Sequence, residues 1–136
     1  MNILVKTLTL LLSLVAINIA LANETPQVSQ QQLLSMQSAP KSPALIILDV
    51  RTQEEFDEGH IQGALNISHN LLSDKLTELD AKLNGDKSAL IVVHCRSGRR
   101  AAKAEEVLKQ NNYTNVRHLA GDIKLWQENN LPLVKQ

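Results

Sequence analysis

The sequence predicts an α/β fold in a single domain, with a central, mostly parallel sheet and helices on both of its faces. Two short apolar runs, residues 44–50 and 89–94, have the length and composition of strands that are buried on both faces. Segments with apolar residues at helical spacing separate the strand-like runs, so strands and helices alternate along the chain. No internal repeat, low-complexity tract or interdomain linker interrupts this alternation.

The first 22 residues have the pattern of a cleavable secretory signal peptide. One cation, Lys6, precedes an apolar run from Thr7 to Ala22, which ends in Ala-Leu-Ala before the polar "NETPQ". The run is just long enough for a membrane anchor, but the Ala-x-Ala end and the short basic region favour removal. We therefore expect residues 23–136 to form a domain exported to the periplasm, without stable membrane insertion after cleavage.

Composition then limits the class of protein. Cleavage would leave 114 residues with a net charge of −1, because Lys6 is the only charged side chain removed from a balanced chain. Neither this charge nor the single Trp, Tyr and Phe favours a nucleic-acid partner. Exported domains of this size often rely on disulfides, but one cysteine cannot form an internal one. Cys95 is therefore an intermolecular linker, an inert buried side chain or a reactive group.

Local signals place the remaining elements. Ser29 with Gln32, and Thr52 with Glu55, form capping-box patterns that predict helices over 29–37 and 52–58, and Gly59 ends the second helix. Residues 23–27 are expected to form a loose N-terminal arm. The other expected elements are a short strand at 64–67, a helix at 73–83 closed by Asn84-Gly85, a helix at 99–112, a weaker strand at 115–119 and a last helix at 122–130.

The only cysteine lies in a loop, "CRSGRR", between the strand 89–94 and the helix that follows it. Ligands of open α/β sheets bind at the carboxyl ends of the strands, where this loop begins. The free N–H groups of a helix N-terminus attract anions, and Gly98 lets the backbone turn tightly toward them. These features favour the thiolate form of Cys95 and predict that it is a nucleophile in an anion-binding pocket.

Arginines surround this cysteine. In the purely structural alternative, Cys95 is a small buried hydrophobic side chain and the arginines form a solvent-exposed surface. Cations at a helix N-terminus oppose the helix dipole unless an anion compensates them, which favours an anion-binding role for Arg96 and Arg100. Arg99 is equally consistent with a solvated side chain.

The histidines do not suggest a dyad or a metal site. Adjacent residues of a strand point to opposite faces, so we expect His94 to be packed away from the sulfur of Cys95. His60, His69 and His118 have no metal-ligand spacing among themselves, and one cysteine makes no zinc site. The sequence therefore predicts neither a metal nor a cofactor.

Three segments in order resemble the rhodanese family of single-domain sulfurtransferases. "LDVRTQEEFDEGHIQGALNI" (48–67) is similar to the first signature of the family, and "CRSGRRA" to its active-site loop. "NVRHLAGDIKLW" (115–126) resembles the closing segment, in which two glycines usually stand where this chain has Gly121 and Asp122. The resemblance covers nearly all of residues 23–136.

This resemblance implies a ping-pong sulfur transfer. Cys95 would take a sulfane sulfur from thiosulfate or a similar small anionic donor as a persulfide, and a thiophilic acceptor such as cyanide would remove it. Asp49 and Arg51 lie at the carboxyl end of the strand 44–50 and are expected to brace the loop through hydrogen bonds. The sequence is equally consistent with an ordinary surface ion pair between them. The residues expected to hold the donor are Arg96, Ser97, Gly98, Arg99 and Arg100.

Other functions use similar loops. A phosphatase or arsenate reductase needs five residues between its cysteine and a clamping arginine. That arginine would fall at Ala101, whereas Arg100 closes a loop one residue shorter, which favours sulfur over phosphate. A periplasmic persulfide carrier, loaded at Cys95 and delivering to one protein partner without significant turnover, needs the same loop and stays open. An unpaired thiol surrounded by cations disfavours a purely structural secreted protein.

Overall fold

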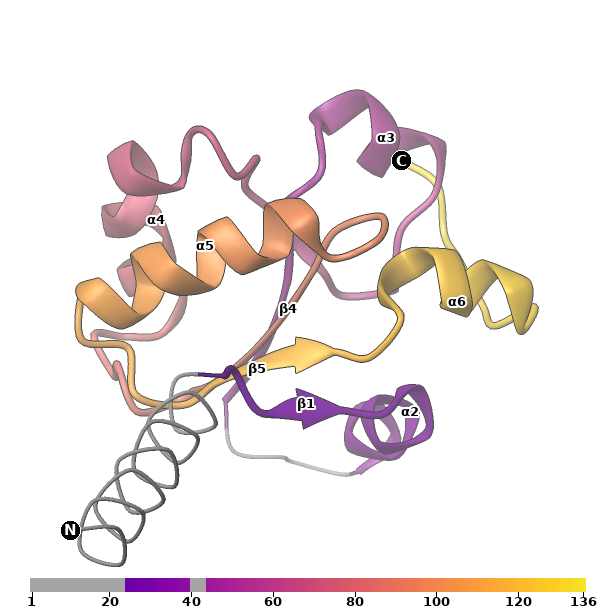
Figure 1. The fold of residues 1–136 in the computed structure, drawn as a ribbon, viewed down its shortest axis with the longest axis horizontal. Coiled ribbons are helices and arrows are strands. Elements are labelled where there is room, and N and C mark those ends of the chain that lie inside the picture. The colour runs from indigo at the N-terminus through magenta and orange to yellow at the C-terminus, as the bar shows by residue number, and fades with distance from the viewer. Residues whose placement is uncertain (1–23, 40–43) are drawn as a thin grey trace, which may run out of the picture.

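The computed structural model describes residues 24–39 and 44–136, which form a five-stranded sheet with helices on both faces (Figure 1). All pairings between its strands are parallel, which confirms the predicted α/β architecture. The strand order is β1-β5-β4-β2-β3, so the two strong predicted strands, β2 and β4, are neighbours. The strands are β1 (Gln27–Val28), β2 (Leu45–Asp49), β3 (Leu65–Asn66), β4 (Leu90–His94) and β5 (Val116–Leu119).

Helices cover the sheet from two sides. The helices α4 and α5 pack on one face, and α2 and α6 pack on the other (Figure 1). The short helix α3 lies beyond the carboxyl ends of the strands (Figure 1). The helices are α2 (Gln30–Ser38), α3 (Gln53–Glu58), α4 (Leu76–Lys82), α5 (Arg99–Gln110) and α6 (Asp122–Glu128), with a 3-10 turn η1 (Leu72–Lys75) before α4.

Both predicted capping boxes are confirmed. The hydroxyl of Ser29 accepts a hydrogen bond from the Gln32 backbone N–H, and the Gln32 side chain accepts one from the Ser29 N–H. Thr52 and Glu55 make the same reciprocal pair at the start of α3. Each box satisfies two backbone donors that a helix N-terminus leaves unpaired, so these local patterns set where the helices begin.

Alternation along the strands divides the core into two clusters. On β4, Ile91, Val93 and then Cys95 belong to the cluster under α4 and α5, whereas Val92 belongs to the cluster under α2 and α6. His94 therefore follows the side of Val92, opposite to Cys95, as the period of a strand requires. This division decides which polar residues can approach the sulfur.

The prediction of a loose N-terminal arm over residues 23–27 is wrong for the last of these residues. Gln27 is part of β1, which pairs in parallel with β5 at the edge of the sheet. The carbonyl of Pro26 accepts a hydrogen bond from the His118 N–H at 2.9 Å, and that of Val28 accepts one from the Ala120 N–H at 2.9 Å. The arm is held because β5 offers an unpaired edge, a partner that lies about 90 residues away in the sequence.

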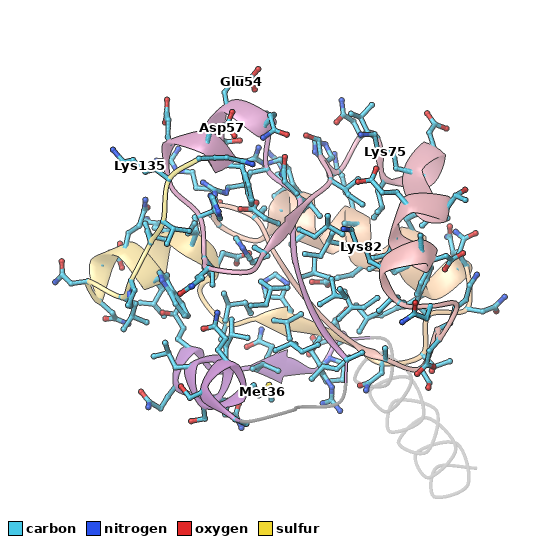
Figure 2. The ribbon with its side chains drawn as sticks, turned by 180° about the vertical axis from the view of Figure 1, so that it is seen from behind. Met36, Glu54, Asp57, Lys75, Lys82 and Lys135 are labelled. Atoms are coloured by element: carbon cyan, nitrogen blue, oxygen red, sulfur yellow. The ribbon has the colours of Figure 1, made fainter. Side chains whose placement is uncertain are left out.

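The surface is polar on the side of α3 and α4. Figure 2 labels Glu54 and Asp57 on α3, Lys75 at the end of η1 and Lys82 at the end of α4. None of the helices in residues 24–39 and 44–136 is long and apolar enough to cross a membrane. The predicted signal peptide, residues 1–22, lies outside the described residues.

Candidate active site

Cys95 follows the last residue of β4, at the point where the chain leaves the sheet for α5. Its side chain is 1% exposed, and its sulfur accepts a hydrogen bond from the Gly98 N–H at 3.0 Å. Arg96 and Ser97, which separate these two residues, are exposed. The loop thus curls around the sulfur and presents a backbone donor to it, which favours an anionic sulfur.

Gly98 is required here for two reasons. Its φ of +109° lies in the region that side-chain-bearing residues rarely adopt. A Cβ at this position would also lie 3.2 Å from Asp122 Oδ2 and 3.6 Å from the ring carbon Cε1 of His118. Glycine therefore allows both the turn that aims the N–H at sulfur and the close approach of Asp122.

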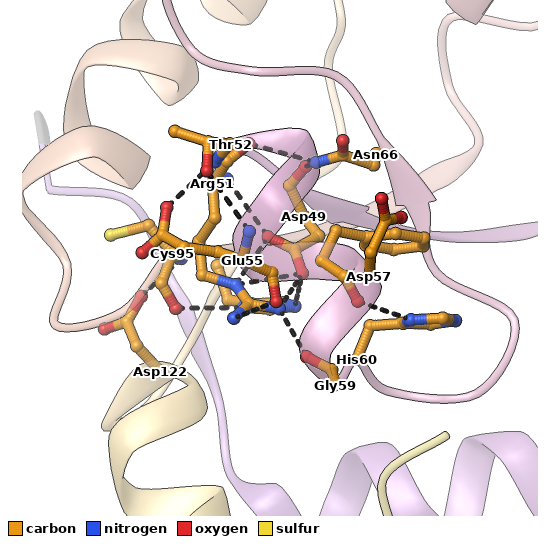
Figure 3. A network of polar contacts seen from close by, with 12 residues as sticks. Asp49, Arg51, Thr52, Glu55, Asp57, Gly59, His60, Asn66, Cys95 and Asp122 are labelled. Carbon is orange, nitrogen blue, oxygen red and sulfur yellow. Dashed lines mark hydrogen bonds and ion pairs between the residues drawn. The ribbon is translucent and has the colours of Figure 1, made fainter. Parts of the chain in front are cut away.

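The start of α6 holds the loop from the other side. Asp122 Oδ1 accepts a hydrogen bond from the Cys95 N–H at 2.9 Å (Figure 3). The N–H groups of Ile123 and Lys124 donate to the carbonyls of Cys95 and Arg96, each at 3.1 Å. In two of these bonds the donors are N–H groups at the N-terminus of α6, and in the third the Asp122 carboxylate accepts from the loop. Together they fix the loop backbone, so α6 sets the position of the sulfur.

Arg100 is held by a carboxylate from α3. Its guanidinium donates to both oxygens of Glu55, at 2.7 and 2.9 Å, in the fork geometry that makes arginine–carboxylate pairs strong. These hydrogen bonds raise the pKa of Arg100, and the charge of Cys95 raises it further to a smaller extent. Glu55 therefore fixes the position of the Arg100 guanidinium.

Glu55→Gln should make the protein less stable at neutral pH by about 1 kcal/mol, because the pair with Arg100 is only partly buried. The hydrogen bonds from Arg100 lower the pKa of Glu55 from 4.5 to about 2. A carboxyl with a lowered pKa stabilises the fold above its ordinary pKa and loses that contribution as the pH falls through the folded value. Urea unfolding should show the difference from wild type shrinking between pH 4.5 and 2, and a difference independent of pH would contradict this.

The other two arginines of the loop have a different setting. Arg96 and Arg99 are both exposed, and the part of the chain that the structure describes gives neither an ion pair. A hollow of about 360 Å³ lies beside the loop, lined in part by Arg96, Arg51, Glu55 and Glu58. Their role in holding a donor stays a prediction.

Asp49 and Arg51 form a buried pair rather than a surface one. Asp49 is fully buried and Arg51 is 5% exposed; the guanidinium donates to Asp49 Oδ2 at 2.7 Å (Figure 3). Arg51 also donates to the carbonyls of Glu55 and Gly59. Among the described residues, no side-chain hydrogen bond of this pair reaches the loop 95–100. Bracing of the loop, which stays a prediction, would act through α3 and its Glu55.

His94 lies on the side of the sheet that faces away from the sulfur. It is fully buried, its Nδ1 is 3.0 Å from the Cys95 carbonyl oxygen, and its Nε2 is 3.7 Å from Asp49 Oδ2. Burial lowers the pKa of His94, against an opposing effect of Asp49, so the imidazole is neutral. Its Nε2 has no hydrogen-bond partner within residues 24–39 and 44–136.

Sequence reasoning missed three residues of this site. Glu55 was read as a helix cap, Asp122 as a lost glycine, and His118 as a histidine without metal-ligand spacing. The signal for Asp122 was available, because it replaces a residue that the resemblance leads one to expect. No three His, Cys, Asp or Glu side chains in the described ranges are arranged to hold a metal ion.

Comparison with known proteins identifies the family. The Rhodanese-like domain family matches residues 29–129. Thiosulfate sulfurtransferase PspE of Escherichia coli is 32% identical over 74 residues, which are 54% of this chain and 67% of that protein. The structure of a human single-domain sulfurtransferase is similar with a TM-score of 0.62 and 30% identity, covering 77% of this chain and 97% of the human one.

The domain also occurs inside longer proteins. The tRNA uridine(34) hydroxylase of Erwinia tasmaniensis is 35% identical over 81 residues, which are 60% of this chain but 23% of that protein. This chain therefore spans about a quarter of that relative and two thirds of PspE. With its parallel sheet, its cysteine loop at the end of β4 and a family match over residues 29–129, this chain belongs to the rhodanese-like domain family.

Proposed function

We propose that this protein is a sulfurtransferase that carries sulfur on Cys95 and takes it from thiosulfate or a similar small anionic donor. One observation carries the proposal: the sulfur of the only cysteine accepts the Gly98 N–H at 3.0 Å at the N-terminus of α5, the helix whose first turn carries Arg100. A backbone donor and a cation together stabilise a thiolate, and afterwards a persulfide, which is also anionic. The name of the Escherichia coli relative supports thiosulfate as the donor.

The transfer proceeds in two balanced steps. The Cys95 thiolate attacks the outer sulfur of thiosulfate, the S–S bond of the donor breaks, and sulfite leaves with the electron pair. A nucleophilic acceptor such as cyanide then attacks the outer sulfur of the persulfide, forms thiocyanate, and releases the Cys95 thiolate. Each step is a displacement at sulfur in which the attacking group and the leaving group are both anions, so no external oxidant takes part.

The length of the loop disfavours phosphate chemistry. A phosphatase clamps its oxyanion with an arginine that stands six positions after the cysteine, where this chain has Ala101. Arg100 closes a loop that is one residue shorter. A periplasmic location is proposed from residues 1–22 alone, which have the pattern of a signal peptide.

The test is the intact mass of residues 23–136 before thiosulfate, after thiosulfate and after cyanide, with thiocyanate measured in parallel. We expect a gain of one sulfur atom that cyanide removes, with repeated turnover. Loading without turnover would favour a persulfide carrier that delivers to a protein partner. No loading would contradict thiosulfate as the donor, and a phosphate ester would then be tested as a substrate.

Arg100→Ala should weaken donor capture, raising KM for thiosulfate about tenfold with a smaller effect on kcat, because one cation beside the sulfur is lost. Lys103→Ala removes an exposed cation from the same helix, α5, outside the cysteine loop, and is the matched control, with less than about a twofold effect. The double variant Arg100→Ala/Glu55→Gln separates the lost cation from the carboxylate left behind. A thiosulfate dependence unchanged in Arg100→Ala would contradict this role.

A further inference from the structure

Three ionisable side chains with little exposure to solvent lie in a row behind the cysteine loop. Glu105 comes from α5, His118 from β5, and Asp122 stands at the start of α6. His118 Nε2 is 2.9 Å from Asp122 Oδ2, and His118 Nδ1 contacts Glu105 Oε1. The exposed fractions of their side chains are 6%, 13% and 3% in this order. The other oxygen of Asp122 accepts the Cys95 N–H, so the row ends on the backbone of the cysteine.

Asp122 occupies a backbone conformation that glycine prefers. Its φ is +54°, and a residue with a Cβ in this left-handed region costs roughly 1 kcal/mol relative to the ordinary helix region. Aspartate is among the few residues that tolerate it. Its carboxylate makes two contacts there, to Cys95 and to His118, that glycine has no atoms to make. The strained position therefore places a buried negative charge against the site of an anionic sulfur.

His118 supplies the compensating charge. Each of its ring nitrogens faces a carboxylate oxygen, and a neutral imidazole has a proton for only one of them. The hydrogen bonds to Asp122 and then Glu105 raise the pKa of His118 to about 10, so the ring is an imidazolium at neutral pH. With this cation the row carries one net negative charge, and without it the row would carry two.

We propose that the row Glu105–His118–Asp122 is a charge-balanced clamp, in which Asp122 fixes the Cys95 backbone and the His118 cation offsets the carboxylate that would otherwise oppose an anionic sulfur. The clamp rests on the proposed function, since it deepens the account of how Cys95 carries a negative charge. His118 and Asp122 are positioning residues here, because neither side chain contacts the sulfur in the described hydrogen bonds.

The remaining groups around His118 are solvent-exposed. The ring also lines a hollow of about 690 Å³, together with Glu24, Glu106 and Lys109. These three side chains are exposed, so solvent screens them more strongly than the buried pair. Gln27, the neighbour of His118 on β1, is uncharged. The direct partners, Asp122 and Glu105, therefore dominate the charge balance.

The test compares single and charge-restoring variants of residues 23–136. His118→Gln leaves two carboxylates uncompensated, and His118→Gln/Asp122→Asn returns the row to one negative charge while keeping an oxygen to accept the Cys95 N–H. The readout is the ultraviolet absorbance of the Cys95 thiolate during a pH titration, with Cys95→Ser as the blank. We expect His118→Gln to reduce the thiolate fraction about tenfold at a fixed pH below its midpoint, and the double variant to restore it.

Glu106→Gln is the matched control, because it removes an exposed carboxylate from the same hollow without touching His118, and we expect no change. A double variant no better than His118→Gln would overturn the clamp, since a purely structural role predicts additive damage. If His118→Gln does not fold, Asp122→Asn alone decides: NMR of the His118 ring should show its titration midpoint well below the wild-type value, and an unchanged midpoint would overturn the proposal. The thiolate readout needs no sulfur donor, so failure of the clamp and failure of the sulfurtransferase proposal are distinguishable.

Discussion

Cys95→Ser is expected to abolish sulfur loading and to lower thiocyanate formation by about 10³-fold or more, as loss of the nucleophile does in covalent catalysis. The serine hydroxyl is not ionised at neutral pH and cannot form the S–S bond of a persulfide. The sequence contains no second cysteine that could take over. Intact mass after thiosulfate should therefore match the untreated variant, whereas wild type gains one sulfur atom.

The fold of this variant should remain. The serine hydroxyl can still accept the Gly98 N–H, and the smaller atom leaves a small cavity whose cost is about 1 kcal/mol. Circular dichroism and urea unfolding check this. Loading of sulfur onto Cys95→Ser would show that another group is the carrier, and an unfolded variant would show that the buried thiol is structural.

The strands and the helix starts were predictable because their causes are local. The run 44–50 became β2 and the run 89–94 became β4, since continuous apolar residues suit a strand covered on both faces. Thr52 and Glu55 marked the first turn of α3 because both partners of a capping box lie within four residues. The same locality explains why the cysteine loop was placed correctly between β4 and α5.

The contacts that complete the site were not predictable in this way. Glu55 and Arg100 are separated by 45 positions, and their pairing depends on how α3 packs above the sheet. The Glu55 oxygen that caps α3 by accepting the Thr52 N–H also accepts from Arg100, so one carboxylate performs a local and a long-range role. Only the local role leaves a pattern in the sequence. The β1–β5 pairing was missed for a related reason, since a two-residue edge strand is defined by its partner.

Arg51→Met should reduce the free energy of unfolding by about 3–5 kcal/mol, which is the usual cost of leaving one charge of a buried pair without its partner. Asp49 is fully buried, and the Arg51 guanidinium donates to both of its carboxylate oxygens. After the substitution the carboxylate keeps the Arg51 backbone N–H, and the neutral His94 ring lies 3.7 Å away. Urea unfolding at neutral pH measures the loss, and Glu54→Gln, an exposed change on α3, is the control.

The double variant Asp49→Asn/Arg51→Met distinguishes two contributions of Arg51. If the buried charge of Asp49 causes the loss, neutralising it should recover most of the stability. Removing both charges of a buried pair costs less than leaving one of them without its partner. If the bonds from Arg51 to the Glu55 and Gly59 carbonyls matter more, the double variant should stay destabilised. In that case α3 would lose its anchor, Glu55 would no longer hold Arg100, and KM for thiosulfate should rise as it does in Arg100→Ala. A loss below about 1 kcal/mol would contradict both, since it is the value expected of a solvent-exposed pair.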